Sequence, residues 1–147
     1  MVKMEAVDTR LRALREYLTY LEGKQSLSQG ELLANVDVYY AVLHILQLAC
    51  QVSVDMASHI LAADFSRRAD RYKDVILALG AEGVMPLEFA QRFAGIAGFR
   101  NIVIHEYLVV DPIKVYELLQ TGPDDFRAFA RYVVDYLRQS GATLESP

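Results

Sequence analysis

The feature that most constrains this chain is the stretch from Glu31 to Ala63, which contains no proline or glycine and is apolar on more than one side. Proline and glycine are the residues that most disfavour a helix, so their absence predicts one very long helix here. At 1.5 Å per residue this helix would extend about 50 Å, longer than a compact chain of this size easily covers. We therefore expect part of its surface to face another subunit.

Apolar residues at alternating steps of three and four predict further helices on both sides of this stretch. The expected helices run from about Lys3 to Gly23, from the charged break at residues 66–70 to Leu79, from Pro86 past residue 100, from Asp111-Pro112 to about Thr121, and from Pro123 onward. No segment alternates for long enough to predict a strand, although Ile102-Val103-Ile104 is β-branched and locally ambiguous. The sequence thus predicts an all-α, up-and-down bundle of about five to six helices in one domain, residues 1–147.

Composition narrows the class of protein further. With 53% hydrophobic and 23% charged residues, the chain has enough apolar surface for a core and for a partner, so we expect at least a dimer. No apolar run reaches the roughly 20 residues of a membrane span, and the N-terminus lacks the pattern of a signal peptide. These features predict a cytoplasmic protein that does not bind membranes. The single cysteine, Cys50, excludes an intramolecular disulfide and suits a buried thiol.

The formal net charge of −4 means that nucleic-acid binding would need a local basic surface. The charged break after the long helix supplies a candidate for phosphate binding, the cluster of Arg67, Arg68 and Arg71. Four tyrosines could stack on bases, but their helical neighbours favour packing instead; they are Tyr17, Tyr20, Tyr39 and Tyr40.

Residues that could take part in catalysis gather in the segment 100–107, Arg-Asn-Ile-Val-Ile-His-Glu-Tyr. On an uninterrupted helix Arg100 and His105 would lie about 140° apart, whereas Asn101 and His105 share a face, so the Asn101 amide can orient the imidazole. Arg100 could meet His105 only at a frayed helix end or across a symmetric interface. Gly95 and Gly98, just upstream, predict the close approach of another backbone or of a ligand.

Histidine moves protons near neutral pH and arginine stabilises charge that develops on phosphate, a combination that suits cleavage of RNA by its own 2′-hydroxyl. No metal would be needed, and we find no recognisable cluster of metal ligands. An arginine and a histidine five residues apart also occur by chance. The alternative is therefore that Arg100 is an ordinary surface residue and that His105 makes its hydrogen bonds at a helix end without a catalytic role. We expect His44 to pack in the core or in an interface. Asp55 and His59, four residues apart, are more consistent with a hydrogen bond along the helix than with a pair of metal ligands.

The string from Gly98 to Tyr107 resembles the signature of HepT-like HEPN proteins: Arg, a polar residue, three more residues, His, any residue, Tyr. The match is complete at each of these positions. The segment Gly83-Val84-Met85-Pro86, the stretch at residues 46–59, and Asp111 also look like the family's pattern. The resemblance implies a helical-bundle dimer whose two motifs line a shared cleft, with Arg100 and His105 catalytic and Asn101 supporting them. It implies a metal-independent endoribonuclease without a cofactor, acting as the toxin of a toxin–antitoxin pair.

The resemblance also implies a protein partner, a minimal nucleotidyltransferase antitoxin that silences such toxins by attaching AMP to the motif tyrosine, here Tyr107. An adenylylated phenol two residues from His105 would place bulk and negative charge where the RNA phosphate binds. The implied substrate is RNA, either tRNA or mRNA, and not DNA. The chain departs from the family at Leu43-His44, where a Glu-Arg pair often stands, which puts an auxiliary role of the long helix in doubt.

Two other interpretations stay open. An inactive HEPN module that binds a nucleotide, or positions substrate for the nucleotidyltransferase, would show nucleotide binding without strand scission. A purely structural helical dimer would use Arg100 and His105 for stability alone.

Overall fold

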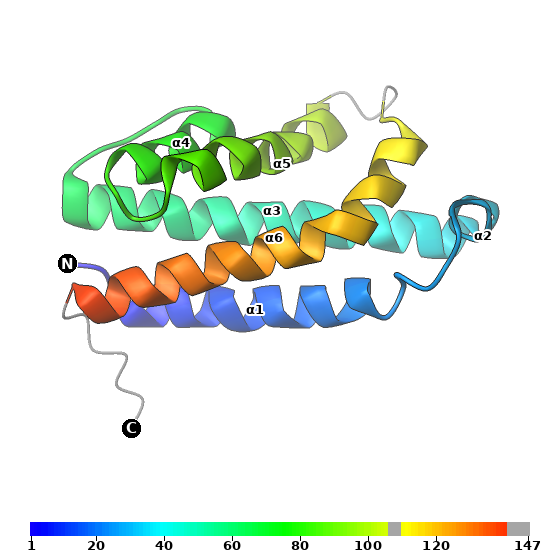
Figure 1. Ribbon diagram of the computed structural model, residues 1–147, viewed down its shortest axis with the longest axis horizontal. Coiled ribbons are helices and arrows are strands. Elements are labelled where there is room, and N and C mark those ends of the chain that lie inside the picture. The colour runs from blue at the N-terminus through cyan, green and yellow to red at the C-terminus, as the bar shows by residue number, and fades with distance from the viewer. Residues whose placement is uncertain (106–109, 141–147) are drawn as a thin grey trace.

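The computed structural model describes residues 1–105 and 110–140, and the side chains of residues 1–99 and 110–140. These residues form six helices and no strand: α1 (Met4–Glu22), α2 (Gln29–Ala34), α3 (Val36–Phe65), α4 (Tyr72–Ala81), α5 (Leu87–His105) and α6 (Pro112–Gln139). Figure 1 shows α3 along the middle of an up-and-down bundle, with α1 on one side of it and α4 and α5 on the other. The predicted all-helical bundle with one long helix is confirmed, and Ile102-Val103-Ile104 lies within α5.

The long apolar stretch is divided at Asn35, so the prediction of one helix from Glu31 to Ala63 is wrong at its start. Asn35 has an extended backbone, and its side-chain oxygen accepts a hydrogen bond from the Val38 N–H at 3.2 Å. This capping bond satisfies a backbone donor at the start of α3 that has no partner inside the helix. The 30 residues of α3 still make a helix about 45 Å long.

The two helices predicted after residue 111 are one helix, α6, with Pro123 inside it. A proline lacks the N–H that would bond to the carbonyl four residues earlier, which here belongs to Leu119. The Gln25 side-chain amide supplies the missing donor, since it donates to the Leu119 carbonyl at 3.1 Å and to the Gln120 carbonyl at 3.2 Å. Figure 1 shows that α6 bends in this region without ending.

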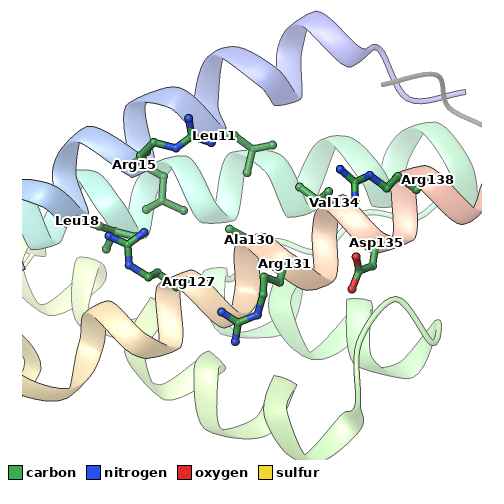
Figure 2. Close-up of a pocket in the computed structure, with 10 residues that line it drawn as sticks. Leu11, Arg15, Leu18, Arg127, Ala130, Arg131, Val134, Asp135 and Arg138 are labelled. Carbon is green, nitrogen blue, oxygen red and sulfur yellow. The ribbon is translucent and has the colours of Figure 1, made fainter. Parts of the chain in front are cut away.

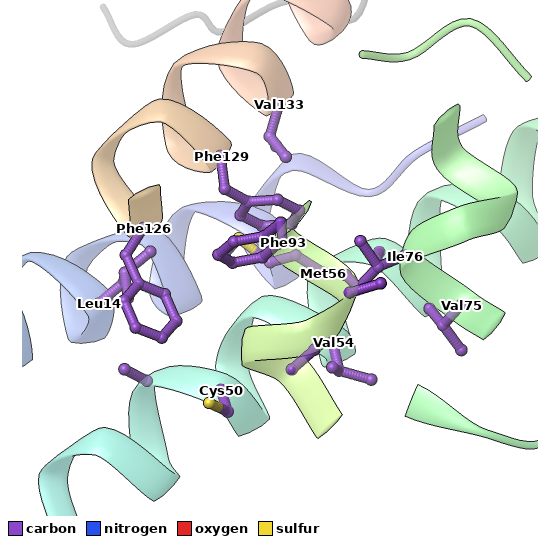
Figure 3. Close-up of a cluster of buried hydrophobic side chains, with 14 of the residues drawn as sticks. Leu14, Cys50, Val54, Met56, Val75, Ile76, Phe93, Phe126, Phe129 and Val133 are labelled. Atoms are coloured by element: carbon purple, nitrogen blue, oxygen red, sulfur yellow. The ribbon is translucent and has the colours of Figure 1, made fainter. Parts of the chain in front are cut away.

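An aromatic cluster fixes α5 against α6. Phe93 of α5 stacks on Phe129 with ring centroids 4.7 Å apart, and it meets Phe126 edge-on at 5.4 Å (Figure 3). All three rings are fully buried, and each contributes about 1.5–3 kcal/mol by leaving water. Cys50 is buried as predicted, and its thiol donates to the Ile96 carbonyl at 3.4 Å. These contacts set the rotation of α5 about its own axis, which decides which of its residues face outward.

Within the described residues, α3 is the one helix long and apolar enough to cross a membrane by length and composition, although polar residues interrupt its apolar runs. Half of its most apolar window is buried, and α3 packs against α1, α4, α5 and α6, as a core helix does. Its first turns leave an exposed stripe of Val36, Tyr40 and His44 at successive steps of four. His44 is therefore not a core histidine, and this stripe is surface of the long helix that the described residues leave uncovered.

Candidate functional site

The predicted chemical segment lies at the C-terminal end of α5. The helix is continuous from Leu87 to His105, so the positions of Arg100 and His105 are separated by about 140° around its axis. Position 101 lies about 40° from position 105 and shares its side of the helix. The structure describes the backbone of Arg100, Asn101 and His105 but not their side chains, and Tyr107 lies outside the described residues.

The two sides of α5 differ in what covers them. Position 100 lies two turns beyond Phe93, on the side of α5 that packs into the core. Position 105 lies two turns beyond Gly98 and within about 20° of it around the axis. A Cβ atom added at Gly95 or Gly98 would meet nothing within 4 Å, so no other backbone of the described chain approaches these glycines. The side of α5 that carries Gly98 and position 105 is open, and any group that approaches it must come from outside the described residues.

The start of α6 and the first turns of α3 lie near one another at this end of the bundle. Asp111 caps α6 by accepting a hydrogen bond from the Ile113 N–H at 3.0 Å, as predicted. Burial raises the pKa of the Tyr39 hydroxyl, with further contributions from Tyr40 and from the Asp111 carboxylate. The Tyr40 ring meets Tyr39 edge-on, with centroids 5.3 Å apart, and Tyr40 is 62% exposed. The prediction that the tyrosines pack is confirmed for Tyr17, Tyr20 and Tyr39 and wrong for Tyr40.

The arginine cluster of residues 67, 68 and 71 lies at the opposite end of the bundle. It follows the C-terminus of α3, whereas α5 ends beside the N-terminal half of α3 (Figure 1). Arg67 is paired with Glu82 at 2.9 Å, while Arg68 and Arg71 are exposed. Because α3 is about 45 Å long, these arginines and the α5 motif cannot bind the same phosphate group.

Asp55 and His59 do not bond to each other, so the predicted helical hydrogen bond between them is wrong. Asp55 accepts from the Gln51 amide at 2.8 Å and lies 3.8 Å from the Arg10 guanidinium. The His59 Nε2 atom accepts from the Lys3 backbone N–H at 3.0 Å. Both side chains therefore tie α3 to the N-terminal segment. In the part of the chain that the structure describes, no group of three or more His, Cys, Asp or Glu residues could hold a metal ion.

The structure also reveals a groove of about 410 Å³ between α1 and α6 that the sequence reasoning did not single out. Four arginines line it, Arg15 from α1 and Arg127, Arg131 and Arg138 from α6 (Figure 2). Arg127 forms a bidentate ion pair with Glu22, which lowers the pKa of that carboxyl and raises the pKa of the guanidinium. The spacing of residues 127, 131 and 138 on one side of a helix is the signal that sequence analysis could have used.

Comparisons with known proteins agree with this architecture. The chain matches the family model described as ribonuclease HepT-like over residues 8–133. It is 26% identical over 131 residues to a tRNA nuclease HepT of Aphanizomenon flos-aquae (strain 2012/KM1/D3), and the alignment covers 89% of each protein. Among solved structures, YutE from Bacillus subtilis, a cytosolic protein of unknown function, superposes with a TM-score of 0.84 at 16% identity, covering 98% of this chain and 96% of that one.

A second solved structure adds to this picture of the fold. The tri-AMPylated HEPN toxin of Shewanella oneidensis, in complex with an MNT antitoxin, superposes with a TM-score of 0.79 at 16% identity, covering 88% of this chain and 97% of that one. At such identities the two solved structures establish the shared helical fold. The family model spans most of the sequence and includes the complete motif of residues 100–107, and the chain therefore belongs to the HepT-like ribonuclease family.

Proposed function

We propose that this chain is an endoribonuclease toxin that works as a homodimer, with Arg100 and His105 as catalytic residues and Asn101 as the residue that orients the imidazole. The observation that carries the proposal is the complete motif in the sequence of a HepT-like chain, with positions 100–105 on α5 and position 105 on a side of the helix that the described chain leaves open. The Aphanizomenon relative is a tRNA nuclease, which makes tRNA the first substrate to test. YutE is described as cytosolic, and the cytoplasm is the compartment in which we place this protein.

The proposed reaction is attack of the RNA on its own backbone. His105 accepts the proton of a 2′-hydroxyl, the resulting oxyanion bonds to the adjacent phosphorus, and the bond from phosphorus to the 5′-oxygen breaks. The leaving 5′-oxygen takes up a proton, so the products are a 2′,3′-cyclic phosphate and a 5′-hydroxyl. Arg100 stabilises the additional negative charge on the phosphate oxygens during this step. Protein side chains supply every catalytic group, so the reaction is metal-independent.

The geometry of α5 favours a site built from two chains. Positions 100 and 105 of one helix are about 140° apart, so one phosphate cannot lie against both within a single protomer. A two-fold axis near the C-terminal end of α5 would bring Arg100 of one protomer to His105 of the other, and it would create two equivalent sites. The exposed stripe at the start of α3, which includes the apolar Val36 and Tyr40, offers further surface for this interface.

The first test compares His105→Ala with the wild type and with Gln91→Ala, a control at an exposed position on the same helix. We expect wild type and control to cleave tRNA in the presence of EDTA and to leave cyclic phosphate ends, and His105→Ala to lose cleavage while keeping its helical circular dichroism and melting temperature. Cleavage that survives in His105→Ala, or that EDTA abolishes in the wild type, would contradict the mechanism. Nucleotide binding without scission by the wild type would instead identify an inactive HEPN module.

A mixing experiment tests whether the site spans two chains. Arg100→Ala and His105→Ala protomers are each inactive alone, but a mixed dimer would contain one site with both residues intact. Equal mixing places half of the protomers in mixed dimers, so about a quarter of the wild-type activity should return. A mixture that stays inactive although mixed dimers form would place both residues of a site on one chain.

We further propose that a cognate minimal nucleotidyltransferase silences the toxin by AMPylation of Tyr107. The phenol oxygen would attack the α-phosphorus of ATP and release pyrophosphate, which leaves a bulky anion two residues from His105. The Shewanella toxin, described as tri-AMPylated and bound to its antitoxin, supports this regulation. Mass spectrometry after incubation with the nucleotidyltransferase and ATP should find AMP on Tyr107. A Tyr107→Phe protein that is still modified and silenced would exclude this tyrosine as the target.

A further inference from the structure

The groove between α1 and α6 has an apolar floor and a rim of arginines. Its floor residues are Leu11, Leu14, Leu18, Ala130 and Val134, and its charged residues are Arg15, Arg127, Arg131, Asp135 and Arg138. Figure 2 shows Arg15 and Arg138 on the two walls, one from each helix, and Arg131 on the outer edge of α6. The groove is therefore a place where positive charge from both ends of the chain meets on one surface.

Charge in this groove is opposite in sign to that of the whole chain, which carries a formal net charge of −4. Glu22 neutralises Arg127, but the guanidinium groups of Arg15, Arg131 and Arg138 have no hydrogen bond or ion pair with any described residue. Four other arginines each pair with a carboxylate; they are Arg10, Arg12, Arg67 and Arg92. With Asp135 counted against the three unpaired guanidinium groups, the groove keeps a net charge of about +2, and this local positive potential attracts a polyanion.

The lining of the groove indicates which polyanion fits. Of the floor residues, Leu14 and Leu18 are only 1% and 2% exposed and the other three are half-buried, so every exposed side chain of the groove lining is charged. The floor supports the aliphatic stems of the arginines, whose guanidinium heads remain at the rim, where they can bind phosphate oxygens in pairs. Among the described residues, none that lines the groove is aromatic, so they offer a base no ring on which to stack. These features favour contacts to a phosphate backbone without reading of sequence.

We propose that this groove binds the phosphate backbone of the RNA substrate at a distance from the cleaved bond, an inference that rests on the proposed ribonuclease function. α1 and α5 do not contact each other, because α3 lies between them. The other wall of the groove, α6, packs against α5, so one to two helix-to-helix distances, roughly 10–20 Å, separate the groove from α5. An RNA that reaches both must extend well beyond the scissile phosphate, so the groove makes long RNA a better substrate than short oligonucleotides.

The test uses a triple variant, Arg15→Gln, Arg131→Gln and Arg138→Gln, in a His105→Ala background so that bound RNA stays intact. A matched control, Lys3→Gln, Arg12→Gln and Lys73→Gln, removes the same charge from exposed side chains outside the groove. Fluorescence anisotropy then measures the Kd for a single-stranded RNA of about 30 nucleotides across a range of salt concentrations. Each lost contact makes the slope of log Kd against log salt shallower by about 0.7, so the groove variant should lose about 2 from the slope and bind roughly 100-fold more weakly at 0.1 M salt.

The control variant should keep nearly the whole slope, because its cations lie outside the groove. In proteins that retain His105, the groove variant should also bring the ratio of cleavage rates for the long RNA and for a trinucleotide closer to one. An unchanged slope in the groove variant, or an equal loss in the control, would overturn the proposal. So would unchanged RNA binding combined with lost association with the nucleotidyltransferase, which would make the groove a protein-docking site. If the wild type cleaves no RNA, the proposed function fails, and the binding data still decide whether the groove holds RNA.

Discussion

Replacing Gly98 with alanine should make the protein more stable and less active, and the opposite directions of these effects make the experiment informative. Gly98 lies inside α5 without a positive φ, and a Cβ added there would meet nothing within 4 Å. Alanine favours a helix over glycine by about 1 kcal/mol, so the free energy of unfolding should rise by about that amount. For a chain of this size, the melting temperature should increase by about 3–4 °C.

The loss of activity follows from the position of Gly98 two turns before His105 on the same side of α5. If a second protomer and RNA approach this side, an added methyl group interferes, and the larger side chain of Gly98→Leu interferes more. Gly80 supplies the contrast within the same protein, since a Cβ there would lie 2.6 Å from the Ala90 Cβ. Overpacking of this kind costs about 1–3 kcal/mol, which cancels or exceeds the gain of about 1 kcal/mol from alanine, so Gly80→Ala should not raise the free energy of unfolding.

Both quantities are measured on the same preparations. Urea unfolding at protein concentrations low enough for monomers to dominate gives the stability, because dimerisation would otherwise add to it. Cleavage of tRNA and sedimentation at higher concentrations give the activity and the assembly state. Full activity in Gly98→Leu would remove this side of α5 from the site. Reduced stability in Gly98→Ala would mean that a part of the chain outside the described residues already covers it.

Two further predictions concern contacts that hold the bundle together. Gln25→Ala should lower the free energy of unfolding by about 2 kcal/mol, because the buried Leu119 carbonyl then loses its hydrogen-bond donor. Pro123→Ala restores a backbone N–H, so in that background urea unfolding should show a loss smaller by about 1 kcal/mol. Equal losses in both backgrounds would mean that Gln25 does not replace the hydrogen bond missing at Pro123. The hydrogen bond from Arg127 lowers the pKa of Glu22 below its ordinary value of 4.5, so this pair stabilises the fold above that value, and its contribution disappears as the pH falls through the lowered pKa. Both side chains are at least 34% exposed, which limits the contribution to at most about 1 kcal/mol, and Glu22→Gln should flatten the acid side of the stability profile; an unchanged profile would mean that the pair contributes nothing.

Helix ends could be predicted where the capping group lies in the adjacent sequence. Asp111-Pro112 marked the start of α6 because the carboxylate caps a donor only two residues away. Asn35 is a similar capping residue, but the long apolar stretch around it contains no proline or glycine and therefore predicted an uninterrupted helix. At Pro123 no local rule could succeed, because the donor that keeps α6 continuous is the side chain of Gln25, nearly one hundred residues earlier.

The motif shows the same division between local and distant causes. The sequence by itself determined the angle between Arg100 and His105, because the period of an α-helix is a property of the backbone. Only tertiary packing decided which side of α5 is open, since that depends on the stacking of Phe93 against Phe129 of another helix. The arginine groove likewise exists only where α1 and α6 pack side by side. Helix formation depends on neighbouring residues, whereas burial depends on residues that meet only after the chain has folded.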